Sequence, residues 1–350
     1  MNRAFINRIG TAIPPHDIHA AYRDFIAKAL DGRHRIVFER MADRAGIAHR
    51  YSVLQQDGMV EADEAREGFY RRGAYPGTAA RMRAYATHAP VLAMQAVEAL
   101  GRPVRDVTHL ILASCTGFVA PGLDQILARQ LGLRPDLQRL LIGFMGCSAA
   151  VPALRAAQAI VLADPAARVL VVNVELCTLH LQETTGLEEA LSSLLFGDGA
   201  AAALVTAEPE GLCLGDFVNV LIPGTEEYIT WQIGDQGFVM HLSGQVPVAI
   251  LRTLRDSPRT LLRGEDQKID LWAVHGGGRT VLDAVQAGLG LPEAALAPSR
   301  VVLAAQGNMS SATVMFVLAG MLRSAAPGQL GLAMAFGPGM VAETFRFSMS

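Results

Sequence analysis

Charged and aromatic residues are both scarce in this chain of 350 residues. Only 18% of the residues are Asp, Glu, Lys or Arg, against about 25% in an ordinary soluble domain. Aromatic residues make up 6%. Disorder requires low hydrophobicity and high charge, so a composition that is 51% hydrophobic excludes that class. Small and aliphatic side chains, with 34 glycines, supply most of the apolar share and favour helices packed closely on buried sheets.

An excess of charge of one sign is also missing. Thirty basic and 33 acidic residues give a formal net charge of −3, which is too balanced for a nucleic-acid binder that depends on a basic face. The most apolar stretches, such as residues 310–322, are shorter than the about 20 apolar residues that span a membrane. The first 17 residues hold no apolar run typical of a signal peptide. We therefore expect a soluble, cytoplasmic protein with no nucleic-acid partner and no membrane span.

Cysteine is rare as well. The four cysteines, Cys115, Cys147, Cys177 and Cys213, form no CxxC pair, and no histidine cluster has metal-ligand spacing. No metal site is therefore predicted. Free cysteines usually pack as small buried hydrophobic residues. Cys147 differs from the others because it stands in GFMGCSAA, between a strand-like run and a helical one.

The two halves of the sequence share one order of elements. Aliphatic runs alternate with Ala-rich stretches from residue 108 onward, which predicts βα units on a buried sheet. THLILASCTG, RLLIGFMGCSAAVPALRAAQAIV, RVLVVNVEL and GDGAAAALV correspond to IDLWAVHGGG, RVVLAAQGNMSSATVMFVLAGML, GQLGLAMAFGPG and MVAETFRF. Each series is interpreted as strand–loop, strand–turn–helix, strand and strand. Cys115 and Cys147 lie 147 − 115 = 32 residues apart, and His275 and Asn308 lie 308 − 275 = 33 apart.

This correspondence predicts an α/β fold built from two related halves. Acidic TAEPEG at 206–211 is the candidate boundary, with residues 1–206 carrying the N-terminal helices and Cys147, and residues 207–350 carrying His275 and Asn308. If the halves pack about a pseudo-twofold axis, equivalent strand ends meet near that axis. Ligands of open α/β sheets bind where strands end and helices begin. We therefore expect a cysteine, a histidine and an asparagine at one site.

Those three residue types suit nucleophilic catalysis. A thiol at a helix N-terminus has a lowered pKa, and a neighbouring imidazole lowers it further by forming a thiolate–imidazolium pair. Backbone N–H groups in the turn of Cys147 could bind an oxyanion. His275 lies in VHGGGR, where three glycines leave room for a substrate. The alternatives are a structural cysteine, a hydrogen-bonded core histidine and, for Asn308 in QGNMSSA, a plain helix N-cap.

Five separated motifs, GFMGCSAA, WAVHGGG, QGNMSSA, LFGDGAAAALV and AFGPG, resemble the thiolase-fold condensing enzymes. Among these the chain is most similar to the type III polyketide synthases, the chalcone synthase-like family, over about residues 40–347. The resemblance implies a thiolase-like αβαβα layered fold. It also implies loading of an acyl group from coenzyme A and extension with malonyl-CoA, without a carrier protein. No cofactor is implied beyond the coenzyme A of the thioester substrates.

The same resemblance assigns roles to individual residues. Cys147 would be the nucleophile, and His275 and Asn308 would stabilise the enolate formed when malonyl-CoA loses carbon dioxide. Phe196 occupies the place of a phenylalanine that gates the coenzyme A tunnel, and Arg40 and Arg44 match basic helix positions that bind coenzyme A phosphates. The alternatives are an ordinary core aromatic and a solvated helix face. The expected substrate pocket comprises Phe196, Met240, Cys115, Cys177, His180, Gly337 and Pro338.

Several positions depart from the plant members of the family. Met240 replaces a second gating phenylalanine, and Cys115 and Cys177 replace threonines of the pocket wall. Ala120 stands where plant enzymes carry a methionine that reaches the partner subunit. These changes indicate a bacterial-type member. ELCTLHLQ, with His180, is most similar to enzymes that make alkylresorcinols or alkylpyrones from long fatty acyl starters.

Three other functions remain open on the sequence alone. A ketoacyl synthase of the type that starts fatty acid synthesis would share the triad and stop after one condensation. A cysteine hydrolase could use Cys, His and Asn, although papain-like proteases lack the duplicated halves. A non-catalytic acyl-binding partner subunit would not require Cys147. We also expect a homodimer, with the strand RVLVVNVEL pairing across a twofold axis.

Overall fold

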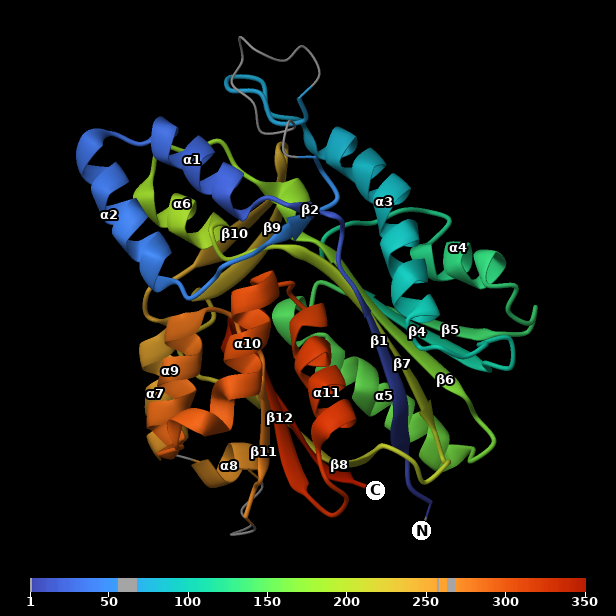
Figure 1. Cartoon of the computed structure of the whole chain (residues 1–350). Helices are drawn as coiled ribbons and strands as arrows, with labels where there is room; N and C mark the ends of the chain where they lie inside the picture. Colours follow the sequence, from blue (N-terminus) through green and yellow to red (C-terminus); the bar gives the residue numbers. More distant parts are fainter. Residues whose placement is uncertain (1, 56–67, 257, 263–267) are drawn as a thin grey trace.

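The computed structural model describes residues 2–55, 68–256, 258–262 and 268–350 (Figure 1). One sheet of nine strands forms its centre, in the order β11-β12-β13-β8-β1-β7-β6-β4-β5. The bounds of these strands are β1 (Phe5–Ala12), β4 (His109–Ser114), β5 (Gln138–Gly143), β6 (Val169–Leu176), β7 (Asp198–Thr206), β8 (Leu212–Leu221), β11 (Leu271–Val274), β12 (Leu330–Gly337) and β13 (Val341–Met349).

Apart from β5, which has no counterpart among the described strands of the second half, the strand order is symmetric about the junction of β1 and β8, which are antiparallel neighbours. On one side β4 and β6 are parallel and β6 and β7 antiparallel; on the other β11 and β12 are parallel and β12 and β13 antiparallel. The two sequence halves thus occupy equivalent places on either side of the junction. This arrangement confirms the expected thiolase-like fold.

Helices cover both faces of the sheet and fill the space between its two halves (Figure 1). The central layer holds α5 (Ala150–Ala163) and α11 (Ala312–Ser324), whose side chains share one core with strands of both halves. One outer layer contains α3 (Thr78–Glu98) and α4 (Leu123–Gln130). The opposite layer contains α7 (Val246–Asp256), α8 (Pro258–Leu262), α9 (Arg279–Leu289) and α10 (Ala297–Gln306).

Smaller elements lie at the upper end of the sheet in Figure 1. They are α1 (His19–Ala29), α2 (Gly32–Arg44), α6 (Leu187–Ser193), the pair β2 (His16–Asp17) and β3 (Tyr51–Ser52), and the hairpin of β9 (Ile229–Gly234) and β10 (Gly237–Leu242). Short 3₁₀ turns follow several strands: η2 (Gly146–Ser148), η3 (Cys177–His180) and η5 (Pro338–Met340), with η4 (Glu293–Leu296) before α10.

The alanine-rich strand β7 explains how the layers approach each other. Ala200, Ala202 and Leu204 face the core around α3, whereas Ala201, Ala203 and Val205 face the core around α5 and α11. Strand side chains alternate between the two faces, so small residues on both faces bring a helix layer close to each side. Large aromatic side chains on β7 would keep these layers apart, which is consistent with the low aromatic content of the chain.

Two expectations about individual elements are wrong. The run RVVLAAQ was expected to be a strand, but residues 297–306 form α10, which begins with Pro298 in its first turn and packs on α9, η4 and α11. The strand RVLVVNVEL was expected to pair across a dimer axis. It is β6, buried along its whole length between β4 and β7, so both of its edges are already paired.

One apolar stretch also differs from expectation. Within the described ranges, residues 146–163 are long and apolar enough to cross a membrane by length and composition. Of this stretch 56% is buried inside the protein, and α5 contacts β4, β6, β7, β13 and α11. Core helices of globular proteins meet the same criterion, and the packing around α5 is that of a core helix.

A close approach between β1 and α3 provides a test of this packing. A Cβ at Gly10 would collide with the backbone carbonyl of Ala96, so Gly10→Ala should lower the free energy of unfolding by about 1–3 kcal/mol. Gly320→Ala, in α11 with nothing within 4 Å of the added carbon, should raise it by about 0.5–1 kcal/mol. Urea denaturation of both variants measures the difference. Equal midpoints would contradict the packing described.

Candidate active site

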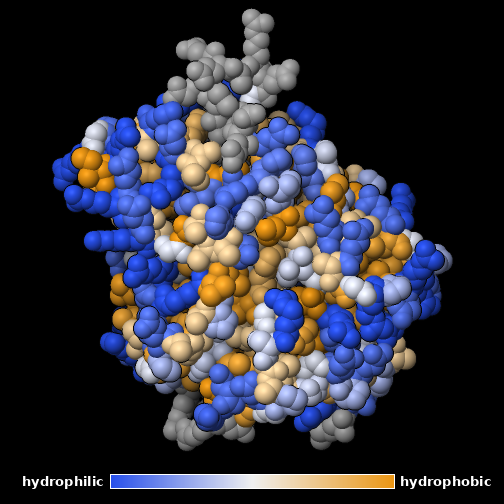
Figure 2. Space-filling model, in the orientation of Figure 1, coloured by the Kyte–Doolittle hydropathy of each residue, from blue (hydrophilic) through white to orange (hydrophobic). Residues whose placement is uncertain are grey.

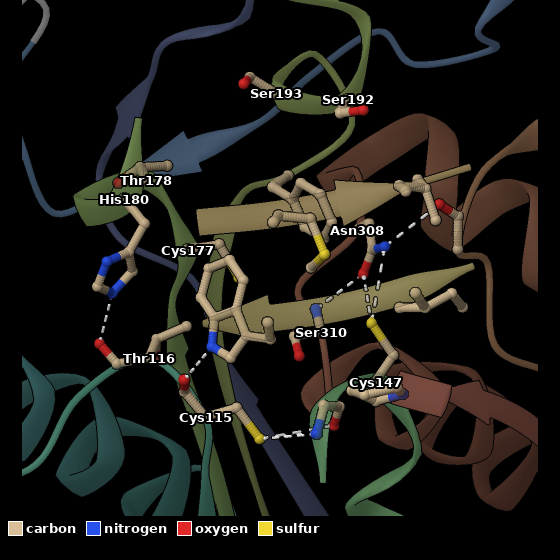
Figure 3. Close-up of a pocket in the computed structure, with 18 of the residues that line it drawn as sticks. Cys115, Thr116, Cys147, Cys177, Thr178, His180, Ser192, Ser193, Asn308 and Ser310 are labelled. Atoms are coloured by element: carbon tan, nitrogen blue, oxygen red, sulfur yellow. Dashed lines mark hydrogen bonds between the residues drawn. The ribbon is translucent and has the colours of Figure 1, made fainter. Parts of the chain in front are cut away.

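One cavity is lined by residues of both halves, and Cys147, His275 and Asn308 all face it. Cys147 comes from η2, directly after β5; His275 follows β11; Asn308 lies between α10 and α11. The three residues predicted from the duplicated pattern therefore meet at one place, although 161 residues separate Cys147 from Asn308. Figure 3 shows the Asn308 amide directed at the Cys147 sulfur.

Cys147 is presented by a sharply turned segment between β5 and α5. Phe144 has a φ of 56° and Gly146 one of 57°, the left-handed region that glycine tolerates best. The ring of Pro338 lies where a side chain at Gly146 would be, and a Cβ at Gly337 would collide with Ser148. The AFGPG motif of the second half therefore packs on the turn that carries the nucleophile.

The Asn308 side chain is held by three contacts that set its direction. Its Oδ1 accepts the backbone N–H of Ser310 at 2.8 Å, and its Nδ2 donates to the carbonyl of Gly277 at 3.2 Å. Both amide atoms lie 4.0 Å from Cys147 Sγ. Since an amide nitrogen carries two hydrogens, the second N–H of Asn308 is left for the sulfur or for an oxygen bound beside it.

His275 is buried, with 1% of its surface exposed. Within the described residues neither ring nitrogen has a hydrogen-bond partner. Gly277 lies against the ring, since a Cβ there would be 3.5 Å from Nε2. Burial lowers the pKa of His275 to about 4, so the imidazole is neutral at neutral pH, with one nitrogen able to accept a proton. The expectation of a hydrogen-bonded core histidine does not describe this ring.

The electrostatics of Cys147 differ from the expectation of a thiol activated by its helix position. Burial raises the pKa of Cys147 to about 11, and the charge of Glu175 raises it further, although the Ser310 hydroxyl and the Asn308 amide lower it. In addition, the Gly146 N–H donates to Cys115 Sγ at 3.0 Å and is not free for an oxyanion. The resting pair is a neutral thiol and a neutral imidazole.

The residues predicted for the pocket line this same cavity: Phe196, Met240, Cys115, Cys177, His180, Gly337 and Pro338. The polar atoms of His180 are already used. Its Nε2–H donates to the carbonyl of Thr116 at 2.7 Å, and its Nδ1 accepts the N–H of Phe238 at 2.9 Å. Burial lowers the pKa of His180 to about 3, so it presents a neutral wall.

Several cavity residues were missed at the sequence level. Ser310 lies two positions after Asn308 within QGNMSSA, so the motif could have indicated it. Trp231, on β9, donates from its indole to the carbonyl of Cys115 at 2.8 Å, and no local pattern marks it. Glu175 lies behind the cavity on β6. It accepts hydrogen bonds from Ser311, Thr116 and the Cys115 N–H, and burial raises its pKa to about 7.

Arg40 and Arg44 are not among the residues that line the cavity. Both are exposed on α2, which packs on α6, and α6 contributes Ser192 and Ser193 to the cavity wall. The carbonyl of Arg44 accepts a hydrogen bond from Arg279, at the start of α9. The two arginines thus border the site from outside. No group of three potential metal ligands comes together in the described part of the chain.

Comparison with known proteins agrees with this geometry. The family model for the N-terminal domain of chalcone and stilbene synthases matches residues 1–209, and that for the C-terminal domain matches residues 215–349. The C-terminal type III polyketide synthase domain of Steely1 from Dictyostelium is 27% identical, with a TM-score of 0.90 and 99% of both chains covered.

Two other solved structures extend the comparison. PKS-I from the brown alga Ectocarpus siliculosus is 30% identical, with a TM-score of 0.88, 100% of this chain and 99% of that chain covered. CsyB in complex with CoA-SH has the same fold, with 22% identity, a TM-score of 0.87 and coverage of 99% and 100%. The chain belongs to the chalcone and stilbene synthase family and is an acyl-transferring polyketide synthase of type III.

Proposed function

We propose that this enzyme loads an acyl-CoA starter on Cys147, extends it with malonyl-CoA and cyclises the product to an alkylresorcinol or alkylpyrone. The observation that carries the proposal is the meeting of Cys147, His275 and Asn308 on one cavity. Each supplies a different element of the chemistry: a nucleophile, a neutral base and a neutral hydrogen-bond donor. We divide the chain functionally at residues 206 and 207, with the nucleophile in one half and its two partners in the other.

In the loading step the Cys147 sulfur attacks the thioester carbon and its proton passes to His275. The bond between that carbon and the coenzyme A sulfur then breaks, and coenzyme A leaves as the thiol after taking the proton back. Because burial disfavours each charge separately, the thiolate and imidazolium are stable only as an adjacent pair. Transfer of the proton from Cys147 to His275 leaves the sum of their two charges at zero.

In the extension step malonyl-CoA loses carbon dioxide and its thioester becomes an enolate. The free N–H of Asn308 and the N–H of neutral His275 stabilise the enolate oxygen without removing a proton from carbon. The enolate carbon then attacks the acyl carbon on Cys147, forming a carbon–carbon bond and releasing the Cys147 sulfur. Decarboxylation supplies the electron pair, so the site needs no strong base.

The shape and polarity of the cavity support an extended apolar starter. Figure 3 shows Ser192 and Ser193 on the side of the pocket away from Cys147. The wall includes Met240, whose flexible thioether replaces a rigid ring. Ring-stacking of His180 on Phe238, with centroids 4.3 Å apart, closes one side with an uncharged surface.

Coenzyme A is proposed to enter as the handle of both substrates, with no resident cofactor. Arg40 and Arg44 are exposed on the helix that borders the site and suit its phosphates. CsyB, a solved structure with the same fold, is in complex with CoA-SH, which supports coenzyme A as the handle of the substrates. We propose Phe196, beside Asn308 on the cavity wall, as the side chain that gates the tunnel.

We further propose a cytoplasmic homodimer that forms at the sheet edge made by β5. Leu140 and Leu141 on this edge strand are 44% and 46% exposed, and Phe118 beside it is 42% exposed. Figure 2 shows hydrophobic residues among the hydrophilic ones on one face of the molecule. An exposed apolar edge strand readily pairs with another strand. A second copy of the chain would cover all three residues.

The first experiment incubates purified enzyme with malonyl-CoA and acyl-CoA starters from acetyl to stearoyl, with mass spectrometry of the products. Resorcinols or pyrones extended by two or three acetate units, best with long starters, are expected. Single-condensation products formed only from malonyl on a carrier protein would identify a ketoacyl synthase instead. A chain that never becomes acylated and forms no product would be a non-catalytic partner.

Replacement of the nucleophile is the most direct test of the assigned roles. Cys147→Ala should abolish acyl loading and reduce product formation by at least about a thousandfold, because the proposed loading step uses the Cys147 sulfur as its nucleophile. Cys213→Ala, on β8 away from the cavity, should retain both activities. Intact-protein mass spectrometry after incubation with hexanoyl-CoA follows loading. Extended product from the Cys147→Ala variant would remove this residue from its role.

The neutral resting states of Cys147 and His275 make a prediction about pH. Burial raises the pKa of Cys147 to about 11 and lowers that of His275 to about 4, so the imidazole acts as a base during acyl loading and not as a resting charge. His275→Ala should therefore slow acyl loading from hexanoyl-CoA by about a hundredfold at neutral pH and leave the pH profile of Cys147 alkylation unchanged. Iodoacetamide labelling from about pH 6 to 10, read at the Cys147 peptide by mass spectrometry, measures that profile. Alkylation that begins at a lower pH in the unmodified enzyme than in the variant would instead reveal a resting thiolate–imidazolium pair.

A further inference from the structure

A buried arginine, Arg50, lies against the two backbone segments, residues 195–197 and 307–308, at which the halves of the active site meet. Only 1% of its surface is exposed. Its Nη1 donates to the backbone carbonyls of Ser193 at 3.1 Å and Phe196 at 2.7 Å. Its Nε donates to His19 Nδ1 at 3.0 Å, and its guanidinium carbon lies 4.4 Å above the ring of Tyr22. The groups that bind the guanidinium are neutral, and the carboxylates of Asp17 and Asp198 are near enough to raise its pKa.

The charge on Arg50 is retained despite this burial. Burial lowers its pKa to about 10, so the guanidinium is protonated at neutral pH. Charge-assisted hydrogen bonds are about twice as strong as neutral ones, and both carbonyls belong to one short segment, residues 193–196. A cation at this place ties that segment to the core more firmly than a neutral donor would.

The segment held by Arg50 pairs directly with Asn308. The Asn308 N–H donates to the carbonyl of Leu195 at 2.8 Å, and the Gly197 N–H donates to the carbonyl of Asn308 at 3.0 Å. Phe196 and Asn308 thus form an isolated bridge between the halves. These hydrogen bonds fix the position of the Asn308 backbone relative to residues 195–197.

Both crossing segments have a glycine where they pass Arg50. A Cβ at Gly307, where φ is 70°, would lie 2.8 Å from Arg50 Cγ, and one at Gly197 would lie 3.5 Å from Arg50 Cβ. The left-handed conformation at Gly307 is one that glycine adopts readily. The two paired segments therefore pack on the aliphatic part of the Arg50 side chain, and its guanidinium binds the segment at residues 193–196.

We propose that Arg50 is a positioning residue. It sets the placement of the Asn308 amide and the Phe196 side chain through the paired backbone segments at residues 195–197 and 307–308. The proposal rests on the proposed function, in which Asn308 stabilises the enolate. Arg50 itself contacts neither reacting group. Its loss should therefore slow the step that uses Asn308 more than the step that uses Cys147 and His275.

The experiment measures two half-reactions of the full-length enzyme. One is acyl transfer from hexanoyl-CoA to Cys147, and the other is decarboxylation of malonyl-CoA to acetyl-CoA. Arg50→Lys and Arg50→Met should each reduce decarboxylation about tenfold more than acylation, since small misplacement of a catalytic group is costly. Arg50→Lys keeps the charge and is the variant of choice if Arg50→Met does not fold.

Arg81→Met is the matched control. Arg81 is also fully buried and donates to the carbonyls of Pro76, Leu179 and Leu181. Its variant should lower the melting temperature and leave the ratio of the two half-reactions unchanged. If the Arg50 variants also keep that ratio, Arg50 is structural only and the proposal is overturned.

A double-mutant cycle separates this proposal from the proposed function. In an Asn308→Ala background, Arg50→Lys should cause no further loss of decarboxylation, because the group that it positions is gone. Multiplicative losses would overturn the role of Arg50 and leave that of Asn308 intact. If Asn308→Ala alone left decarboxylation unchanged, the proposed role of Asn308 would fail, and the positioning role with it.

Discussion

Two short backbone segments, residues 195–197 and 307–308, pair across the halves of this protein, and the arrangement of the active site depends on that pairing. Cys147, the proposed nucleophile, belongs to one half, and its two proposed partners, His275 and Asn308, belong to the other. Without a fixed contact between them, the distance from Asn308 to the sulfur would vary with every movement of one half against the other. A pair of hydrogen bonds and a buried bridge at the cavity wall remove that freedom. Catalytic groups require such tight placement.

The burial that orders the site also opposes its charged forms. Burial shifts the pKa values of Cys147 and His275 in the directions that favour their uncharged forms, so the two side chains form no ion pair at rest. With both groups uncharged, an apolar acyl chain can approach Cys147 without removing water from an ion at that position. In the proposed loading step the thiolate forms only as the imidazole takes the proton.

Much of the architecture was predictable because it repeats. Paired motifs with nearly equal spacing located Cys147, His275 and Asn308 without knowledge of the fold, since duplication places equivalent strand ends together. The element at 297–306 was misjudged because a short aliphatic run suits a strand or a helix equally, and packing on α9 and α11 decided for the helix. Trp231 and Arg50 were not predictable, because their partners are main-chain carbonyls distant in sequence. The pKa of Cys147 was misjudged because desolvation depends on neighbours that a local motif does not show.

The fully satisfied His180 has a consequence for substrate choice. Both of its ring nitrogens are engaged by the main chain, so it offers the acyl group no unpaired donor or acceptor. At that wall the enzyme can therefore distinguish acyl groups only by their volume. One methylene in an apolar pocket changes the binding free energy by only about 1–3 kcal/mol. A wall of this kind distinguishes acyl groups gradually by size and not by a specific polar contact.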